Sequence, residues 1–374
     1  MIKSEPNLYD IALTFLPGIG DINAKKIFSC FRNTEELFLT KISDLEKCPG
    51  IGKISAQKIF ATFQTAVDLA KKELEFIYKN DINVVSYSEE NYPYRLRECA
   101  DSPFVLYHKG NINFNKEKII AIIGTRNPTK YGNKFCDKFI DELSEKYPDS
   151  VIISGLAYGI DIISHKAAIK NNIETWAVLG NGLASIYPAA HKKTADIILE
   201  KNGAIISDFP HDTKPDAQNF PMRNRIVAGL CDAVIVVESG IKGGSMITAT
   251  IANSYNRDVF ALPGNIDAPQ SQGCNKLIKT NKAQLIESIN DLEYILGWDT
   301  KIDTKKQKVK IDKTNLNCFE VIIVDAMEKT DNIDIDVLIR ETDLDINTIN
   351  LTLLELEMKE IIESLPGKRF CLKL

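Results

Sequence analysis

The stretch KIIAIIGTRNPTKYG, residues 118–132, decides the fold class predicted for this chain. It begins as a continuous apolar run and ends in a loop that carries one glycine, Gly124, and one arginine, Arg126. A strand that runs into a glycine-containing turn is typical of nucleotide-binding α/β folds. The dinucleotide fingerprint requires three glycines and a P-loop requires Gly-Lys-Ser/Thr, and this loop has neither.

Five further apolar runs repeat the pattern along the chain. They are SVIISG (150–155), ETWAVLG (174–180), GAIIS (203–207), DAVIVVE (232–238) and RDVFALPG (257–264), with helical segments between them. Continuous apolar strands separated by helices indicate a parallel sheet covered on both faces. We therefore predict a Rossmann-like, doubly wound α/β core over residues 81–298, to which the irregular segment 81–114 is a lead-in.

An internal repeat precedes this core. LPGIGDINAKKIF (16–28) and CPGIGKISAQKIF (48–60) align with an offset of 32 residues, and apolar positions at helical spacing flank both glycine turns. Residues 1–80 therefore resemble a tandem helix-hairpin-helix, SAM-like helical domain, a family of small DNA-backbone binders. Gly18, Gly20, Gly50 and Gly52 are candidate secondary DNA contacts, since such turns expose backbone N–H groups. A tight turn that only packs helices remains the alternative.

The C-terminal part differs from the core in charge. Residues 299–314 are lysine-rich without hydrophobic periodicity, and we expect them to form a basic linker. Residues 315–374 predict three helices and a two-stranded wing, which is a winged-helix domain. That segment has 6 Lys+Arg against 13 Asp+Glu, net -7, whereas the rest has 40 against 38, net +2. The acidic tail and the near-neutral body are therefore expected to have different partners.

Composition narrows the class of protein further. The chain has no run of 18 apolar residues and begins with charges where a signal peptide is apolar, so we expect neither a membrane span nor export. The eight cysteines are never closer than 18 positions, which fits a reduced cytoplasm better than disulfides or zinc. No metal-ligand cluster or nucleophilic triad is evident, and we expect no metal, cofactor or catalytic residues.

The loops that follow the predicted strands carry the candidate site. Ligands of doubly wound sheets bind at the carboxyl ends of the strands, where backbone N–H groups and arginines attract phosphate. The predicted phosphate-binding residues are Gly124, Thr125, Arg126, Gly155, Gly159, Gly180, Gly182, Lys192, Arg223, Asn224, Arg225, Gly243, Gly244, Ser245, Thr248 and Lys276.

Several of these assignments have competing interpretations. We expect one of Arg223 and Arg225 to face the phosphate and the other to pair with a core carboxylate. His165 lies four residues after Asp161, on the same helix face, but without a third ligand we expect a packed, hydrogen-bonded histidine. Tyr187 either stacks a base or closes the core.

The motifs together resemble one family. GTR, SGLAYGIDIISHKAA, AVLGNGLASIYP, FPMRNRIVAGL, GGSMITA and FALPGNIDAPQSQGCNKLI are similar to segments of the DNA-processing DprA (Smf) family. The resemblance covers nearly the whole chain. It implies a cytoplasmic protein that binds single-stranded DNA, dimerises through its core and loads RecA recombinase, notably in natural transformation. It assigns the phosphate-gripping arginine to Arg126. Relatives often carry lysine directly after Tyr187-Pro188, where this chain has Ala189 and then Lys192 further on.

An enzyme of related fold is the alternative. Phosphoribohydrolases that cleave nucleoside monophosphates carry a PGGxGTxxE motif, and GGSMITAT from Gly243 is a partial match. Thr250 stands at the position of the glutamate, and its hydroxyl is no carboxylate acid–base. The sequence therefore favours a binding protein over a nucleotide-processing hydrolase.

Overall fold

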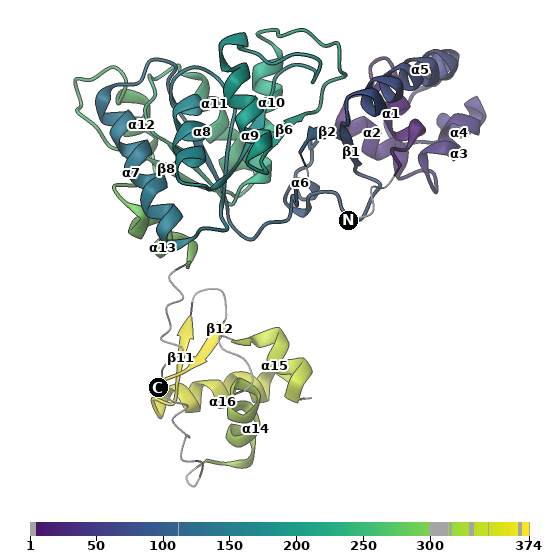
Figure 1. The fold of residues 1–374 in the computed structure, drawn as a ribbon. Helices are drawn as coiled ribbons and strands as arrows, with labels where there is room; N and C mark the ends of the chain where they lie inside the picture. The colour runs from purple at the N-terminus through teal and green to yellow at the C-terminus, as the bar shows by residue number, and fades with distance from the viewer. Residues whose placement is uncertain are drawn as a thin grey trace. The chain divides into compact units, whose positions relative to one another are not determined.

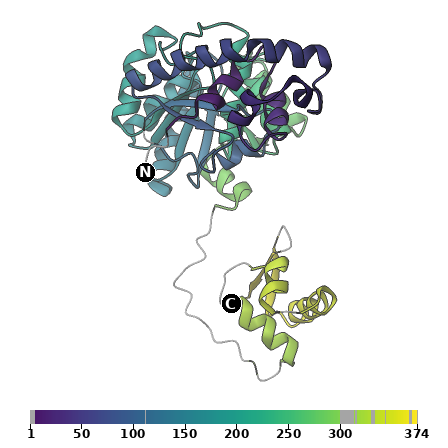
Figure 2. The same cartoon turned by 90° about the vertical axis from the view of Figure 1, so that its right-hand side faces the viewer.

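The computed structural model describes residues 5–110, 112–298, 313, 316–328, 333–342, 344–365 and 369–373 (Figures 1 and 2). The chain divides into two compact units, 1–298 and 299–374. The predicted linker lies outside the described residues, except for Lys313, which forms ion pairs with Asp325 and Glu328. Within the described ranges, no helix is long and apolar enough to cross a membrane.

A nine-stranded sheet forms the centre of the first unit, in the order β1-β2-β6-β5-β4-β3-β7-β8-β9. Its strands are β1 Asn83–Ser86, β2 Val105–Lys109, β3 Ile119–Ile123, β4 Val151–Ser154, β5 Glu174–Val178, β6 Ala204–Ser207, β7 Ala233–Val236, β8 Asp258–Ala261 and β9 Gln284–Leu285. The strands from β6 to β9 are parallel, and β1 and β2 are antiparallel to their neighbours. The predicted doubly wound α/β core is confirmed.

Helices cover both faces of this sheet. They are α6 Tyr94–Arg97, α7 Lys130–Lys146, α8 Ile160–Lys170, α9 Lys192–Glu200, α10 Asn219–Leu230, α11 Gly244–Ser254, α12 Gln272–Lys279 and α13 Ile289–Leu296, with a short 3-10 helix at Ala189–His191. Alternate residues of the strands face opposite ways. In β3, Ile119 and Ala121 pack with α10, α11 and α12, while Ile120 and Ile122 pack with α7, α8 and α13.

The strand order reverses between β3 and β7. From β3 the chain winds through β4 and β5 to β6, and it then returns to β7 on the other side of β3. Loops that follow β3 and β7 therefore diverge and leave a crevice at the carboxyl edge, which is where ligands of such sheets bind.

The N-terminal helices pack against this core within the first unit. They are α1 Leu8–Thr14, α2 Asp21–Phe28, α3 Thr34–Leu39, α4 Ile42–Leu45 and α5 Lys53–Lys79. Seen from the side in Figure 2, these purple to dark-blue helices lie in front of the teal part of the sheet. Buried side chains of α5, such as Ile59 and Ile77, belong to one apolar cluster with Val105 of β2 and Ile198 of α9.

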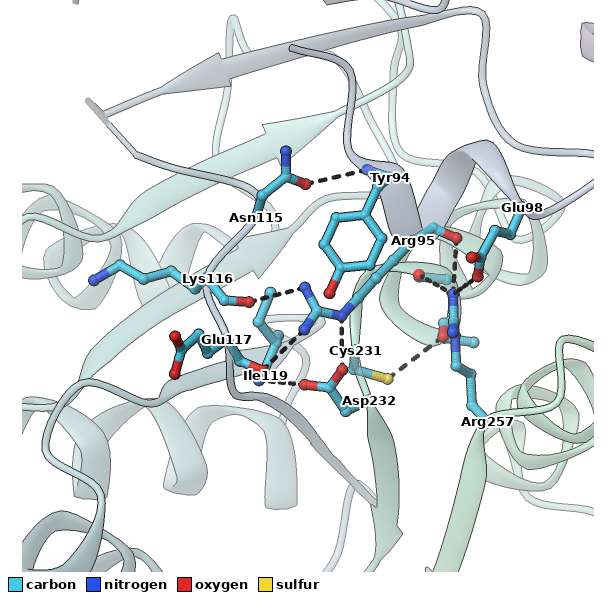
Figure 3. A network of polar contacts seen from close by, with 12 residues as sticks. Tyr94, Arg95, Glu98, Asn115, Lys116, Glu117, Ile119, Cys231, Asp232 and Arg257 are labelled. Atoms are coloured by element: carbon cyan, nitrogen blue, oxygen red, sulfur yellow. Dashed lines mark hydrogen bonds and ion pairs between the residues drawn. The ribbon is translucent and has the colours of Figure 1, made fainter. Parts of the chain in front are cut away.

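The prediction that 81–114 is irregular is wrong. Residues of β1 and β2 pair with each other, and β2 adds to the edge of the parallel sheet through Tyr107 opposite Ser207. Between them, α6 is fastened by Arg95, which donates to Asp232 Oδ1 at 2.7 Å and to the carbonyls of Lys116 and Glu117 (Figure 3). The lead-in is therefore part of the sheet and its amino edge.

The second unit has its own core. Helices α14 Cys318–Met327, α15 Ile335–Thr342 and α16 Ile346–Met358 pack on strands β10 Ile333–Asp334, β11 Ile362–Leu365 and β12 Arg369–Leu372. Among the described residues of this unit, ten buried apolar side chains form the core, including Ile323, Leu338 and Leu353. The strands form a sheet in the order β10-β12-β11, so a third short strand joins the expected two-stranded wing.

Candidate phosphate-binding site

A pocket of about 390 Å³ opens at the crevice between the β3 and β7 loops. It gathers ten of the sixteen predicted site residues, namely Gly124, Thr125, Arg126, Gly155, Arg223, Asn224, Gly243, Gly244, Ser245 and Thr248. Phe220, Asp161, Ser239 and Gly240 also line it. Ser239 and Gly240 follow β7 closely, so the strand-end rule could have found them.

The start of α11 forms one wall of the pocket. Gly243 is the N-cap residue and no side chain caps the helix, so its first N–H groups face the pocket without a competing side-chain acceptor. A Cβ added to Gly244 would meet no atom within 4 Å, which shows that this wall is open. Ser245 donates its hydroxyl to Ser239 Oγ at 2.7 Å. An exposed helix N-terminus of this kind attracts an anion.

Two arginines supply positive charge on the facing walls. The Arg126 guanidinium lies 5.7 Å from the centre of the Phe220 ring. Arg223 is only 5% exposed and donates to the carbonyl of Val178 at 2.6 Å, while its Nε finds no hydrogen-bond partner among the described residues. A Cβ on Gly155 would lie 1.7 Å from Arg223 Nη1, so this glycine makes room for the guanidinium.

A buried carboxylate balances part of this charge. Asp161 lines the pocket in the first turn of α8 and accepts the backbone N–H of Ala157, in the loop before the helix, at 3.3 Å; it does not cap α8, whose N-cap residue is Gly159. Burial raises the pKa of the Asp161 carboxyl, and the nearby Arg223 guanidinium limits that rise.

The other predicted residues lie outside the pocket lining. Arg225 pairs with Asp208 at 2.6 Å and with Asp21 at 2.8 Å, so it is the arginine of the pair that binds core carboxylates. Lys192 pairs with Asp196, and Lys276 lies in α12. The three remaining glycines allow neighbouring loops to approach closely. A Cβ added to Gly159 would lie 2.2 Å from Thr125 O, and one added to Gly180 would lie 2.9 Å from Phe220 Cδ1. A Cβ added to Gly182 would lie 2.0 Å from Pro210 O.

The two glycine hairpins of the N-terminal helices are not equivalent. Gly18 and Gly50 both have positive φ, and no atom lies within 4 Å of an added Cβ at any of the four predicted glycines. Helix α2 begins with Asp21, which is already engaged by Arg225, whereas α5 begins with Lys53. Only the second hairpin, at Gly50 and Gly52, therefore starts a helix whose first turn carries no acidic residue.

Two further expectations concern single side chains. His165 is fully buried and its Nδ1 lies 2.7 Å from Thr175 Oγ1, which confirms the packed, hydrogen-bonded histidine; burial lowers its pKa to about 3. Tyr187 is 45% exposed and its ring stacks on Phe220 with centroids 6.0 Å apart, so it does not close the core. In the described part of the chain, no group of three or more His, Cys, Asp or Glu could hold a metal ion.

A family model described as DNA recombination-mediator protein A matches residues 83–296, more than half of the chain. The chain belongs to this family. A second model, the DprA winged helix domain, matches residues 320–368, which agrees with the winged helix of the second unit. The resemblance to the DprA (Smf) family is thus confirmed.

Individual members of the DNA recombination-mediator protein A family show how far the likeness extends. Protein Smf of Escherichia coli is 39% identical over 219 residues, which are 58% of this chain and 58% of that protein. DNA processing protein DprA of Bacillus subtilis is 42% identical over 212 residues, 56% of this chain and 70% of that protein. The chain therefore spans only a little over half of the length of the Escherichia coli relative.

Two solved structures have the same fold. That of DprA from Streptococcus pneumoniae has a TM-score of 0.65 at 32% identity and covers 78% of this chain and 98% of its own. DNA processing protein A from Helicobacter pylori has a TM-score of 0.52 at 32% identity, covers 58% of this chain and 96% of its own, and is described for its unique single-stranded DNA binding mode.

Proposed function

We propose that this protein binds single-stranded DNA by its backbone phosphates, with one phosphate in the pocket at the start of α11. The observation that carries the proposal is the convergence of an uncapped helix N-terminus with Arg126 and Arg223 at the strand-order reversal. Backbone contacts give affinity without reading sequence. The exposed Tyr187 ring beside Phe220 offers a face on which a base can stack.

The wider role follows from the family. We propose that the protein acts in the cytoplasm as a homodimer through its α/β core and loads RecA recombinase onto DNA during recombination and natural transformation. The match of residues 83–296 to a recombination-mediator family supports this role.

We propose binding without catalysis. The hydrolase motif that GGSMITAT partly matches places a glutamate where this chain has Thr250, and that hydroxyl donates to the carbonyl of Met246 within α11. Incubation of the protein with nucleoside monophosphates should release no free base. Release at a rate that depends on protein concentration would favour the hydrolase instead.

A salt titration tests the proposed function. Binding of a labelled oligothymidylate and of a duplex of equal length is measured by fluorescence anisotropy between about 50 and 200 mM salt. We expect tighter binding of the single strand and a log–log slope of about -0.7 for each phosphate contact. Equal or tighter binding of the duplex, or affinity that does not change with salt, would contradict the proposal.

The affinity for DNA should rise as the pH falls. A phosphate in the pocket raises the pKa of the Asp161 carboxyl beyond the rise that burial already causes, so binding takes up a proton. The affinity for DNA therefore falls as the pH rises through the pKa that the Asp161 carboxyl has in the complex. Asp161→Asn should bind oligothymidylate more tightly than the wild type at neutral pH, with a shallower pH dependence. Parallel pH profiles for the two proteins would refute this.

Gly159→Ala should weaken DNA binding without changing any charge. Gly159 has φ +80°, and an added Cβ would lie 2.2 Å from the backbone oxygen of Thr125 and 2.6 Å from backbone atoms of Arg126. The Arg126 loop must therefore move. Gly297→Ala is the control, since Gly297 also has a positive φ, +63°, but its Cβ would meet no atom within 4 Å and it does not line the pocket. Anisotropy should show a clear loss for the first variant alone, and equal affinities would refute the packing argument.

The second unit should not bind DNA alone. Residues 346–358 of α16, the helix that winged-helix proteins commonly place in the major groove, contain no Lys or Arg. Its exposed side chains include Leu351, Leu354 and Met358. The segment 315–374 has a net charge of -7, which phosphates repel. It folds around its own core, so the isolated segment can be tested. It should give no gel shift at about 0.1 M salt. Micromolar binding would contradict this expectation.

A further inference from the structure

Three helices begin at the carboxyl edge beside the pocket. Their first residues are Lys130 of α7, Ile160 of α8 and Gly244 of α11, and each helix is at least 11 residues long. Any of these N-termini has the polarity to attract an anion. Asp161 already occupies the start of α8, and a second buried carboxylate, Glu238, occupies the start of α7.

Glu238 lies two residues after the end of β7, and its hydrogen bonds hold the turn between β3 and α7. It is 2% exposed. Its carboxylate accepts the backbone N–H of Thr129 at 2.8 Å and the Thr129 hydroxyl at 2.6 Å, while its backbone oxygen accepts the N–H of Thr125 at 2.6 Å. Both ends of the loop that carries Arg126 are therefore bonded to this one residue.

The packing leaves no room for another group at the start of α7. A Cβ on Gly132 would lie 2.6 Å from Glu238 Oε2, so the carboxylate rests against the first turn of the helix. No ion pair to Glu238 is found among the described residues, and the α7 N-terminus is what faces its negative charge. A phosphate placed there would meet a like charge in a site screened from water.

The position of this carboxylate has a direct consequence for ligand choice. In dinucleotide-binding folds, the turn between the first strand and its helix holds the pyrophosphate. Here the equivalent turn, between β3 and α7, is filled by the protein's own anion. Among these three described helices, the start of α11 is the open one, because a Cβ on Gly244 would meet no atom within 4 Å.

We propose that Glu238 is a specificity-determining residue that excludes phosphate from the turn between β3 and α7. It restricts the site to one isolated phosphate at α11, as in a DNA backbone, and rejects the adjacent phosphates of pyrophosphate-containing nucleotides. Identifying the accepted phosphate as part of DNA rests on the proposed function. The exclusion at α7 rests on Glu238 alone.

The test compares variants that separate charge from hydrogen bonding. Glu238→Gln keeps the shape and removes the charge, whereas Thr129→Val keeps the charge and removes the hydroxyl that donates to Glu238 and caps the N–H groups of Tyr131 and Gly132. Glu293→Gln removes a different buried carboxylate, which pairs with Lys146. Inorganic pyrophosphate binding is measured by titration calorimetry, and oligothymidylate binding by anisotropy.

We expect pyrophosphate to bind Glu238→Gln about tenfold or more tighter than the wild type, because an unscreened like charge is removed. The other two variants should stay close to the wild type. Unchanged pyrophosphate affinity in Glu238→Gln, or an equal gain in Thr129→Val, would overturn the proposal. Failure of the wild type to bind oligothymidylate would instead refute the proposed function and leave the pyrophosphate comparison intact.

A measurement on the unmodified protein covers the case in which Glu238→Gln does not fold. Wild-type crystals soaked in inorganic phosphate, a single isolated phosphate, should show the anion at the backbone N–H groups of Gly244 and Ser245. An anion within hydrogen-bond distance of the Thr129 N–H would overturn the proposal whatever the variants do.

Discussion

Replacing Arg126 with alanine should lower the affinity for single-stranded DNA by about 1.5–3 kcal/mol, the range for hydrogen bonds to charged groups. Arg126 lines the pocket beside the open start of α11, and no ion pair of this side chain is found among the described residues. Its guanidinium is therefore available for a phosphate. The slope of log affinity against log salt should also shrink by about 0.7, since one phosphate contact is lost.

A lysine far from the pocket provides the control for Arg126→Ala. Lys201 follows α9 and precedes β6, so it lies at the opposite, amino edge of the sheet. Lys201→Ala removes the same formal charge and should leave both affinity and slope nearly unchanged. If Arg126→Ala folds and binds as tightly as the wild type at moderate salt, the pocket does not hold the DNA. An equal loss in both variants would point to general electrostatics.

The largest loss of stability is expected from Arg95→Ala, which should lower the free energy of unfolding by about 3 kcal/mol. The Arg95 side chain is 2% exposed and donates to Asp232 and to two carbonyls (Figure 3). Asp232 also accepts the backbone N–H of Ile119, at the start of β3. Removing the guanidinium leaves these acceptors without their donor. We expect the lower end of the usual cost of breaking a buried ion pair, because the Asp232 side chain is 25% exposed.

Urea unfolding of the two-unit chain, followed by a probe in the first unit such as Trp176, measures this effect. Arg97→Ala is the matched control in the same helix, since Arg97 is exposed, donates to the carbonyls of Tyr87 and Glu89 and lies over the rings of Tyr87 and Tyr92, without a carboxylate partner among the described residues. It should cost about 1 kcal/mol. If both variants shift the urea midpoint of unfolding equally, the hydrogen bonds of Arg95 do not hold residues 81–114 to the sheet.

The sequence predicted the parallel strands β3 to β8 because each is a continuous apolar run with a glycine or small residue near its end; it missed β9, which is only Gln284 and Leu285. The six runs from 118 to 264 all contain strands of the sheet. Strands β1 and β2 were missed for a physical reason. NVVS has only two apolar residues, and VLYHK ends in polar residues, so neither is a continuous apolar run of the kind that marks the parallel strands. Their pairing is fixed by contacts distant in sequence, such as Tyr107 with Ser207.

The site was predictable as a set of loops and less so as individual contacts. The carboxyl-end rule brought Gly124, Arg126 and Gly244 to one pocket. It could not decide between Arg223 and Arg225, because both lie in α10 and the choice depends on Asp21 from a distant helix. Glu238 was part of a quoted strand, yet its contact with Thr129 spans 109 residues and has no local pattern.

The position of a bound phosphate tests the central claim most directly. The account predicts that a crystal structure with an oligothymidylate shows one backbone phosphate at the N–H groups of Gly244 and Ser245, contacted by the Arg126 guanidinium. A strand bound along another surface, with the pocket at the start of α11 empty of phosphate, would contradict it.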